Sequence, residues 1–237
     1  MTLRYIGSGP YCYANSLAMV MGAEAPEPGV IEVVTGSPFG LQLHEGRTPF
    51  FDPPRADHFM VVLGVEDDRV LFHDPHGFPF ATLPVADFVA AWRTDSIGYP
   101  AESFTLWSGF RRVRNVAPLD AVRAALPAAR DRLLASAERS SGAAAEGLAA
   151  LVEMGLTAGQ REHLVHFAVR VGTRRLADAA TWLARAGQTS AADVAEHQAR
   201  LVGSLQHPLV VGDDARVVHT LRLLAPTYER LGEALVL

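Results

Sequence analysis

Two short apolar runs in the first half of the chain are separated by an acidic turn. The first run covers residues 59–65 and is rich in valine, and the second covers residues 69–73 and stops at Asp74-Pro75. Runs of this length and composition, bounded by turn-forming residues, predict an antiparallel β-hairpin. A loosely alternating stretch at residues 104–113 is a candidate for a third strand.

Helical patterns flank these runs. Residues 12–21 contain neither Gly nor Pro and are rich in Ala, Leu and Met, which predicts a helix that begins at Cys12. Residues 84–93 predict a second helix with Pro84 in its first turn. The first half of the chain therefore has the pattern of an α+β domain.

From Pro118 onward the apolar positions recur at helical spacing. A helix is expected over residues 119–134, with a kink or restart at Pro127. Further helices are expected over residues 143–154, 158–171, 176–186, 191–205 and 213–231. Glycines near the ends of these segments are expected to act as C-terminal caps: Gly155, Gly172, Gly187 and Gly203. The sequence therefore predicts an α+β domain at residues 1–115 and an all-helical domain, either a small bundle or a helical cap, at residues 116–237.

Composition excludes several classes of protein. The 237 residues are 49% apolar and 20% charged, the balance of a globular protein, and their net charge of −5 disfavours binding to nucleic acid. All 21 basic residues are arginines, which excludes lysine-based Schiff-base chemistry. We find no signal peptide and no run long enough to span a bilayer, so we expect a cytoplasmic protein without a membrane partner.

The single cysteine, Cys12, stands at the start of a predicted helix, after the glycine-containing loop at residues 7–10. It excludes an intrachain disulfide and a multi-thiolate metal site. The reactive form of a thiol is the thiolate, which the positive end of a helix dipole favours. Cys12 is thus a candidate nucleophile, and the alternative is a buried, inert thiol.

His58 and Asp74 stand 16 residues apart, at the start of the first predicted strand and at the end of the second. A hairpin brings these positions to the same end of the sheet, where a carboxylate can orient an imidazole. The alternative is a histidine at a strand edge and an ordinary Asp-Pro turn. A metal site of Asp74 with His58, His73 or His76 is conceivable, but alternation places His73 on the opposite face, so we expect neither a metal nor a cofactor. Trp92, Trp107 and Trp182 are expected to anchor the core.

Together, the helix-start cysteine and residues 57–65 and 70–75 resemble the C39-like branch of the papain-like cysteine peptidases. More specifically, residues 73–77, 81–84 and 88–93 resemble the butirosin biosynthesis protein H N-terminal domain family. The resemblance covers about residues 5–113. It implies a papain-like fold for the first half, with Cys12 as the nucleophile, His58 as the general base and Asp74 as the residue that orients it.

Two features differ from the papain-like pattern. Residues 5–11 contain no amide side chain, so the hydroxyl of Ser8 or the backbone N–H of Cys12 would have to stabilise an oxyanion. The segment between Cys12 and His58 is also shorter than we expect for this family.

The resemblance implies thiol-dependent acyl transfer or amide-bond chemistry in the biosynthesis of a specialised metabolite. The donor would be an acyl carrier protein or another acyl thioester, and the acceptor a small-molecule or peptide amine. One alternative is a catalytically degenerate papain-like scaffold whose helical domain binds a partner. A further alternative is an intracellular cysteine peptidase.

Overall fold

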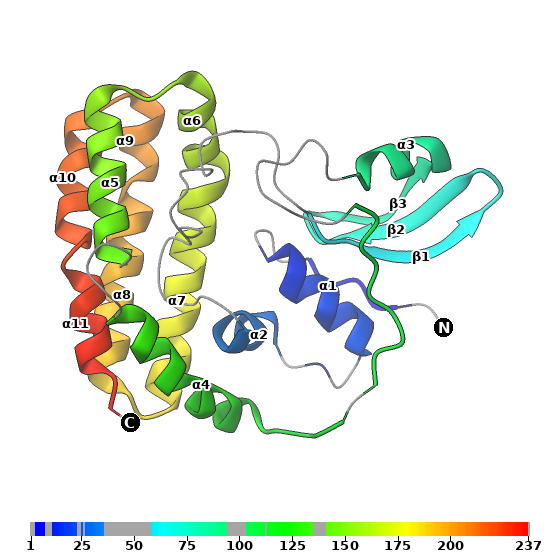
Figure 1. Ribbon diagram of the computed structural model, residues 1–237, viewed down its shortest axis with the longest axis horizontal. Coiled ribbons are helices and arrows are strands. Elements are labelled where there is room, and N and C mark those ends of the chain that lie inside the picture. Colours follow the sequence, from blue (N-terminus) through cyan, green and yellow to red (C-terminus); the bar gives the residue numbers. More distant parts are fainter. Residues whose placement is uncertain are drawn as a thin grey trace. The chain divides into compact units, whose positions relative to one another are not determined.

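The computed structural model describes residues 3–7, 11–22, 25, 27–35, 58–93, 103–111, 113–134 and 141–236. The chain divides into two compact units (Figure 1). Unit 1 consists of residues 1–28 and 54–115, and unit 2 consists of residues 29–53 and 116–237. The predicted division into domains at residues 115 and 116 stays a prediction, and each unit is described by itself.

Unit 1 contains the predicted hairpin. Strands β1 (Val61–Glu66) and β2 (Arg69–Asp74) pair antiparallel, as expected from the two apolar runs. The two-residue turn between them begins at Asp67, whose φ of 54° is the left-handed conformation that such tight hairpin turns require. The third strand is β3 (Phe78–Pro84), which pairs with the other edge of β2 in the order β1-β2-β3.

The predicted third strand at residues 104–113 was wrong. The described residues of that stretch form no regular structure, and β3 lies immediately after β2 instead. The alternation of apolar and polar residues does not predict β3. This strand contains Pro79, and Phe78 and Phe80 are exposed, so its pattern is not that of a half-buried strand.

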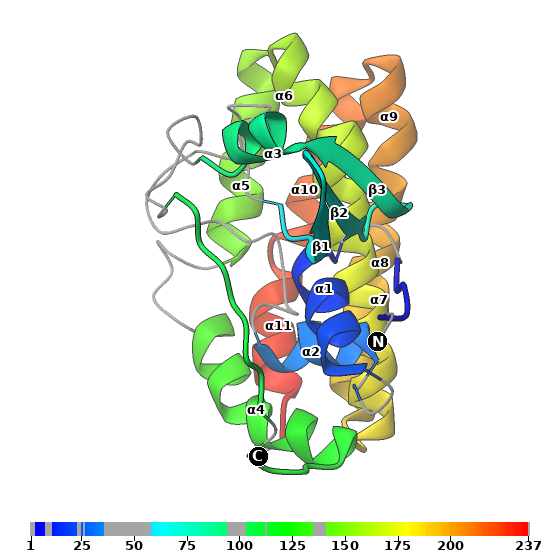
Figure 2. The same cartoon turned by 90° about the vertical axis from the view of Figure 1, so that its right-hand side faces the viewer.

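Two helices lie on opposite faces of this sheet (Figures 1 and 2). Helix α1 (Cys12–Met21) has the predicted bounds, and α3 (Val85–Ala91) lies within the predicted range. Val70 and Phe72 pack with Phe88 of α3 in a small apolar cluster. The residue between Phe72 and Asp74 is His73, which alternation places on the other face and which is fully buried.

In the described part of unit 2 every regular element is a helix. These are α2 (Pro28–Thr35), α4 (Pro118–Leu133), α5 (Ser141–Met154), α6 (Ala158–His163), α7 (Val169–Arg185), α8 (Thr189–Ser204), α9 (Gln206–Val211), α10 (Asp214–Leu224) and α11 (Thr227–Ala234). Pro127 lies inside α4, where it neither ends nor restarts the helix. Val30 of α2 packs with Val122 and Trp182, so a segment from the first part of the chain belongs to the helical unit.

The core of unit 2 is a continuous apolar cluster. Helices α5, α7, α8 and α10 run side by side in it (Figure 1). Their inward positions carry fully buried Leu176, Leu183 and Leu221, with small alanines between them that let the helices approach closely. None of the helices that the structure describes is both long enough and apolar enough to cross a membrane.

One long helical rod replaces two predicted helices. A π-helical segment, Leu164–Ala168, joins α6 directly to α7, and the N–H of Val169 bonds the carbonyl of Leu164. Gly172 is buried inside α7 and Gly203 lies inside α8, so neither is a C-terminal cap as predicted. Gly155 and Gly187 do follow helix ends with positive φ, as predicted.

The described chain is thus mostly helical, with a small three-stranded antiparallel sheet in unit 1. This confirms the α+β class of the first half.

Candidate active site

Helix α1 brings the chain around His58 close to Cys12. Ser16 lies one turn after Cys12 on the same side of the helix, and its hydroxyl donates to the carbonyl oxygen of Phe59 at 3.1 Å. Phe59 follows His58 directly, so this hydrogen bond fixes the segment that enters β1. The Cys12 side chain is partly buried and lies close enough to His58 to influence the pKa of the imidazole.

Asp74 lies at the end of β2 and faces the same histidine. His58 Nε2 is 2.9 Å from Asp74 Oδ1, and the two side chains are 28% and 19% exposed. The backbone N–H of His76 donates to the same carboxylate oxygen at 2.8 Å. The structure therefore brings together the three side chains singled out in the sequence, and the hairpin supplies the proximity of His58 and Asp74.

The proton affinity of His58 differs strongly from that of an exposed histidine. Burial by itself lowers the pKa of His58. The hydrogen bonds with Cys12 and with Asp74, together with the negative charge of both groups, outweigh burial and raise the pKa from 6.5 to about 9. The imidazolium is thus the stable form of His58 at neutral pH. In unit 2, by contrast, burial lowers the pKa of His163.

Ser8, the candidate for stabilising an oxyanion, lies outside the described residues. Cys12 is the first residue of α1, so its backbone N–H is among those at the start of the helix that no helical carbonyl can accept. It therefore remains a candidate oxyanion donor by its position.

An aromatic cluster lies beside Cys12 and His58. Tyr13 follows Cys12, Phe59 follows His58, and their rings meet edge to face at 5.3 Å. Trp107 stacks on Phe59 at 5.4 Å and contacts Tyr13 edge to face at 5.7 Å. The expectation that Trp107 anchors the core was wrong, because it is 54% exposed. The sequence carried no signal for this arrangement, since a long stretch separates Trp107 from the other two rings.

His58, Asp74 and His76 are the described residues that could hold a metal ion. They offer one ligand atom each, and all three atoms lie within 4.8 Å of one another. The rings of His58 and His76 are 4.3 Å apart. A cation there would have to displace the hydrogen bond between His58 and Asp74, so metal binding and the Cys12–His58–Asp74 arrangement compete for the same atoms.

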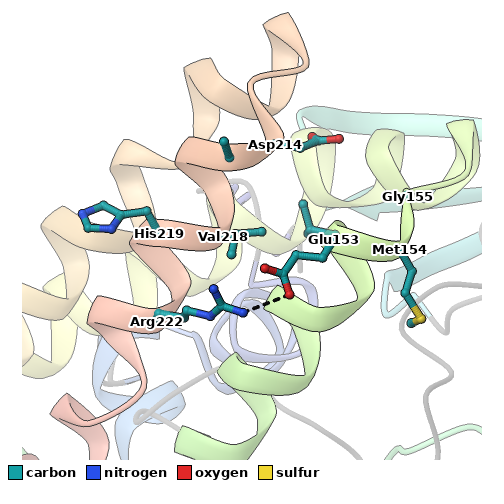
Figure 3. Close-up of a pocket in the computed structure, with 9 residues that line it drawn as sticks. Glu153, Met154, Gly155, Asp214, Val218, His219 and Arg222 are labelled. Atoms are coloured by element: carbon teal, nitrogen blue, oxygen red, sulfur yellow. Dashed lines mark hydrogen bonds and ion pairs between the residues drawn. The ribbon is translucent and has the colours of Figure 1, made fainter.

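A second concave region lies in unit 2, between the end of α5 and helix α10 (Figure 3). Its charged groups already pair with one another or with neighbours. Arg222 donates to Glu153 at 2.9 Å, and Asp214 accepts two hydrogen bonds from Arg161. The lining contains no cysteine or serine, so this pocket offers no nucleophile comparable to Cys12.

Two comparisons with known proteins find a similarity to YobF. The family model described as the YobF C-terminal domain matches residues 136–236. A curated relative, the uncharacterized protein YobF of Bacillus subtilis (strain 168), is 22% identical over 175 residues, covering 47% of this chain. The match spans 57% of the relative's own length. In the comparison with solved structures, none matches.

These matches overturn the resemblance stated from the sequence. Both concern YobF, and neither points to the butirosin biosynthesis protein H family or to C39-like peptidases. That assignment was wrong, and the papain-like and acyltransferase descriptions that came with it lose their family basis. The resemblance was carried by short segments around a hairpin and a helix start, and segments of that length do not define a family. The match to the YobF C-terminal domain lies in the helical region.

Proposed function

We propose that Cys12, His58 and Asp74 form a nucleophilic centre that catalyses acyl transfer or amide-bond chemistry through an acyl group carried on Cys12. The proposal rests on the residues themselves and needs no family assignment. Cysteine–histidine–carboxylate centres occur on unrelated folds, where they are recognised by their geometry.

One observation carries the proposal: His58 is hydrogen-bonded to Asp74 and also lies close enough to Cys12 for the two side chains to interact. Asp74 accepts from Nε2, so Nδ1 is the ring nitrogen that would serve the thiol in this proposal. A histidine shared between a thiol and a carboxylate is the arrangement that yields a thiolate and an imidazolium.

The chemistry follows from that ion pair. The Cys12 thiolate attacks a carbonyl carbon, an Sγ–C bond forms, and the bond to the leaving group breaks while His58 gives the leaving group its proton. An amine or water then attacks the acyl group, His58 takes the proton from it, and Cys12 is released. Asp74 keeps the ring oriented and stabilises its positive charge through both steps.

The substrate class is an acyl compound with a good leaving group, such as an acyl thioester, with an amine or water as the acceptor. An acyl carrier protein is one donor of this chemistry. The same proposal places this protein in the cytoplasm, where such thioesters are made.

The test is formation of a covalent adduct on Cys12. The protein is incubated with iodoacetamide or with the acetyl thioester of N-acetylcysteamine, and mass spectrometry locates and times the modification. We expect rapid labelling of the parent, no adduct with Cys12→Ser, and labelling slowed at least about tenfold with His58→Asn. His166→Asn, which changes an exposed histidine of unit 2, is the matched control and should label at the parent rate.

Labelling of the parent at the rate of a small free thiol, unchanged by His58→Asn, would contradict the proposal and favour a non-catalytic scaffold. A second experiment adds a metal chelator to test whether the same side chains bind a metal ion instead. If a chelator abolishes turnover of the thioester and His76→Asn does the same, the cluster of His58, Asp74 and His76 binds a metal and the thiol mechanism is wrong.

A further inference from the structure

A tyrosine far from Asp74 in sequence holds the turn that carries it. The hydroxyl of Tyr5 donates to the backbone carbonyl of Asp74 at 3.0 Å and accepts from the N–H of Gly77 at 2.9 Å. A phenol hydroxyl can donate once and accept once, so both of these hydrogen bonds form together. Tyr5 thereby connects the first and last residues of the turn between β2 and β3.

This turn determines where the Asp74 carboxylate points. Its Oδ1 accepts from the His76 N–H inside the turn and meets His58 Nε2 outside it. The pairing of β2 with β3 is irregular between Phe72 and Asp74, so regular strand pairing alone does not fix the end of β2. The two hydrogen bonds of Tyr5 act at the place where the strand ladder is interrupted.

The segment that carries Tyr5 is anchored to the same hairpin. His73 is fully buried, and its Nε2 lies 3.1 Å from the carbonyl oxygen of Leu3. Its Nδ1 accepts a hydrogen bond from the backbone N–H of Phe80. This pair of contacts needs the neutral ring with its proton on Nε2. The ring of Tyr5 packs edge to face on His73 at 5.4 Å.

Glycine at position 7 makes room for this arrangement. A Cβ atom on Gly7 would overlap the Tyr5 hydroxyl and the adjoining ring atoms. Any larger residue there forces the Tyr5 ring to move away from the turn, which gives a second way to disturb the same contact without changing Tyr5.

We infer that Tyr5 is a positioning residue. Its hydroxyl bridges Asp74 and Gly77 by two hydrogen bonds, fixes the turn between them, and so holds the Asp74 carboxylate against His58. The inference rests on the proposed function for its catalytic meaning, but its structural content concerns the contact between Asp74 and His58 alone. It predicts that loss of one phenol oxygen weakens the pairing of His58 with Asp74 and leaves Cys12 and His58 themselves intact.

Two measurements on Tyr5→Phe test this. We expect alkylation of Cys12 by iodoacetamide at pH 7 to slow roughly three- to tenfold, the effect of weakening one partly buried hydrogen-bonded contact. We also expect the NMR titration midpoint of His58 to fall from about 9 toward the ordinary value of 6.5, because the Asp74 contact is one of the causes that raise it. A variant that merely loosened the fold would lower the melting temperature without moving this midpoint selectively.

The matched controls lie on the same sheet. Thr82→Val removes a hydrogen bond with Arg69 at the other end of the β2–β3 pair, and it should change neither the alkylation rate nor the His58 midpoint. Gly7→Ala should reproduce the effect of Tyr5→Phe. Gly64→Ala, a glycine substitution with no atom within 4 Å of the new methyl group, should not.

The outcomes separate the inference from the proposed function. If the parent alkylates no faster than a free thiol but the His58 midpoint falls in Tyr5→Phe, the proposed function fails and Tyr5 still positions Asp74. If the parent is reactive and Tyr5→Phe matches it in both rate and midpoint, the inference is wrong. Equal effects of Thr82→Val and Tyr5→Phe would also overturn it, because the effect would then reflect general weakening of the hairpin.

Discussion

Different interactions stabilise the interior of each of the two units of the chain. Unit 2 has a continuous apolar core drawn from most of its helices, and several of its charged side chains pair at the surface. Unit 1 has a small apolar cluster around Val70, Phe72 and Phe88, while polar Asn15, Ser16 and His73 are buried. Burial of apolar surface is non-directional, whereas a hydrogen bond fixes particular atoms at particular distances.

This difference explains where the candidate chemistry lies. Orientation of a carboxylate against an imidazole requires directional contacts, and unit 1 provides them around Asp74 through His58, His76 and Tyr5. The match to the YobF C-terminal domain lies within unit 2. The region that the family model matches is therefore built on apolar packing, and the proposed site lies outside residues 136–236.

The largest effect on stability should come from the core of unit 2. Leu221→Ala removes a fully buried side chain from α10 and should lower the free energy of unfolding by about 2–5 kcal/mol, because it leaves a cavity. Urea denaturation followed by circular dichroism measures this change. Leu223→Ala, at a 49% exposed position on the same helix, is the control and should cost far less. Slower alkylation of Cys12 in folded Leu221→Ala would show that the two units are not independent.

The next effect concerns the site and should leave the bundle unchanged. Asp74→Asn keeps an oxygen that can accept from the His76 N–H but removes the charge opposite His58. Alkylation of Cys12 should slow roughly ten- to hundredfold, the worth of a charge-assisted hydrogen bond of about 1.5–3 kcal/mol. Asp68→Asn, in the exposed turn at the opposite end of β2, is the control for loss of a carboxylate. Equal rates for parent and Asp74→Asn would remove Asp74 from the mechanism.

A smaller effect should appear as pH rises. The pKa of His58 is raised in the folded protein, so its proton stabilises the fold fully below the ordinary pKa of 6.5, and this contribution is lost as pH rises to about 9. Denaturation of the parent between pH 6 and 10 should show a loss of order 1–2 kcal/mol that is absent in His58→Asn. Thioester turnover should decline over the same upper range, because His58 no longer carries a proton. A stability that rises with pH across this range would contradict the assignment.

The smallest effect is expected at the surface of the bundle. Arg222 and Glu153 are about half exposed, so Glu153→Gln should change the free energy of unfolding by less than about 1 kcal/mol. Asp214→Asn breaks a less exposed, two-point pair with Arg161 and should cost more. Thermal denaturation of the two variants shows which substitution lowers stability more. The reverse order would mean that exposure does not control the strength of these pairs.

The sequence predicted the elements whose signals are local. Helix α1 was predicted with its observed bounds, because its start is a break in composition and Gly22 follows its end. The hairpin of β1 and β2 was predicted because an acidic turn separates two apolar runs. That hairpin also predicted the proximity of His58 and Asp74, since an antiparallel register converts spacing along the chain into proximity in space.

Features that depend on distant residues were not predicted. Tyr5 reaches Asp74 across 69 residues, and Trp107 stacks on Phe59, but no short motif connects either pair. Gly172 looked like a cap because glycine is a poor helix residue, yet the apolar neighbours of α7 hold it inside a helix. The family resemblance failed for the same reason, because it was drawn from short local segments.

The π-helical segment Leu164–Ala168 has a consequence for how this rod tolerates insertions and deletions. Each α-helical residue turns the chain by about 100°, so one extra residue held in a wide turn puts the faces of α6 and α7 out of phase. The two parts can then face different neighbours: Arg161 of α6 bonds Leu209 and Asp214, while α7 packs along α8. Deleting one residue from the segment would restore a regular α-helix and swing Arg161 away from both partners. The extra residue of the π-helical segment therefore sets the rotation of α6 relative to α7, and the packing of both helices in the bundle depends on it.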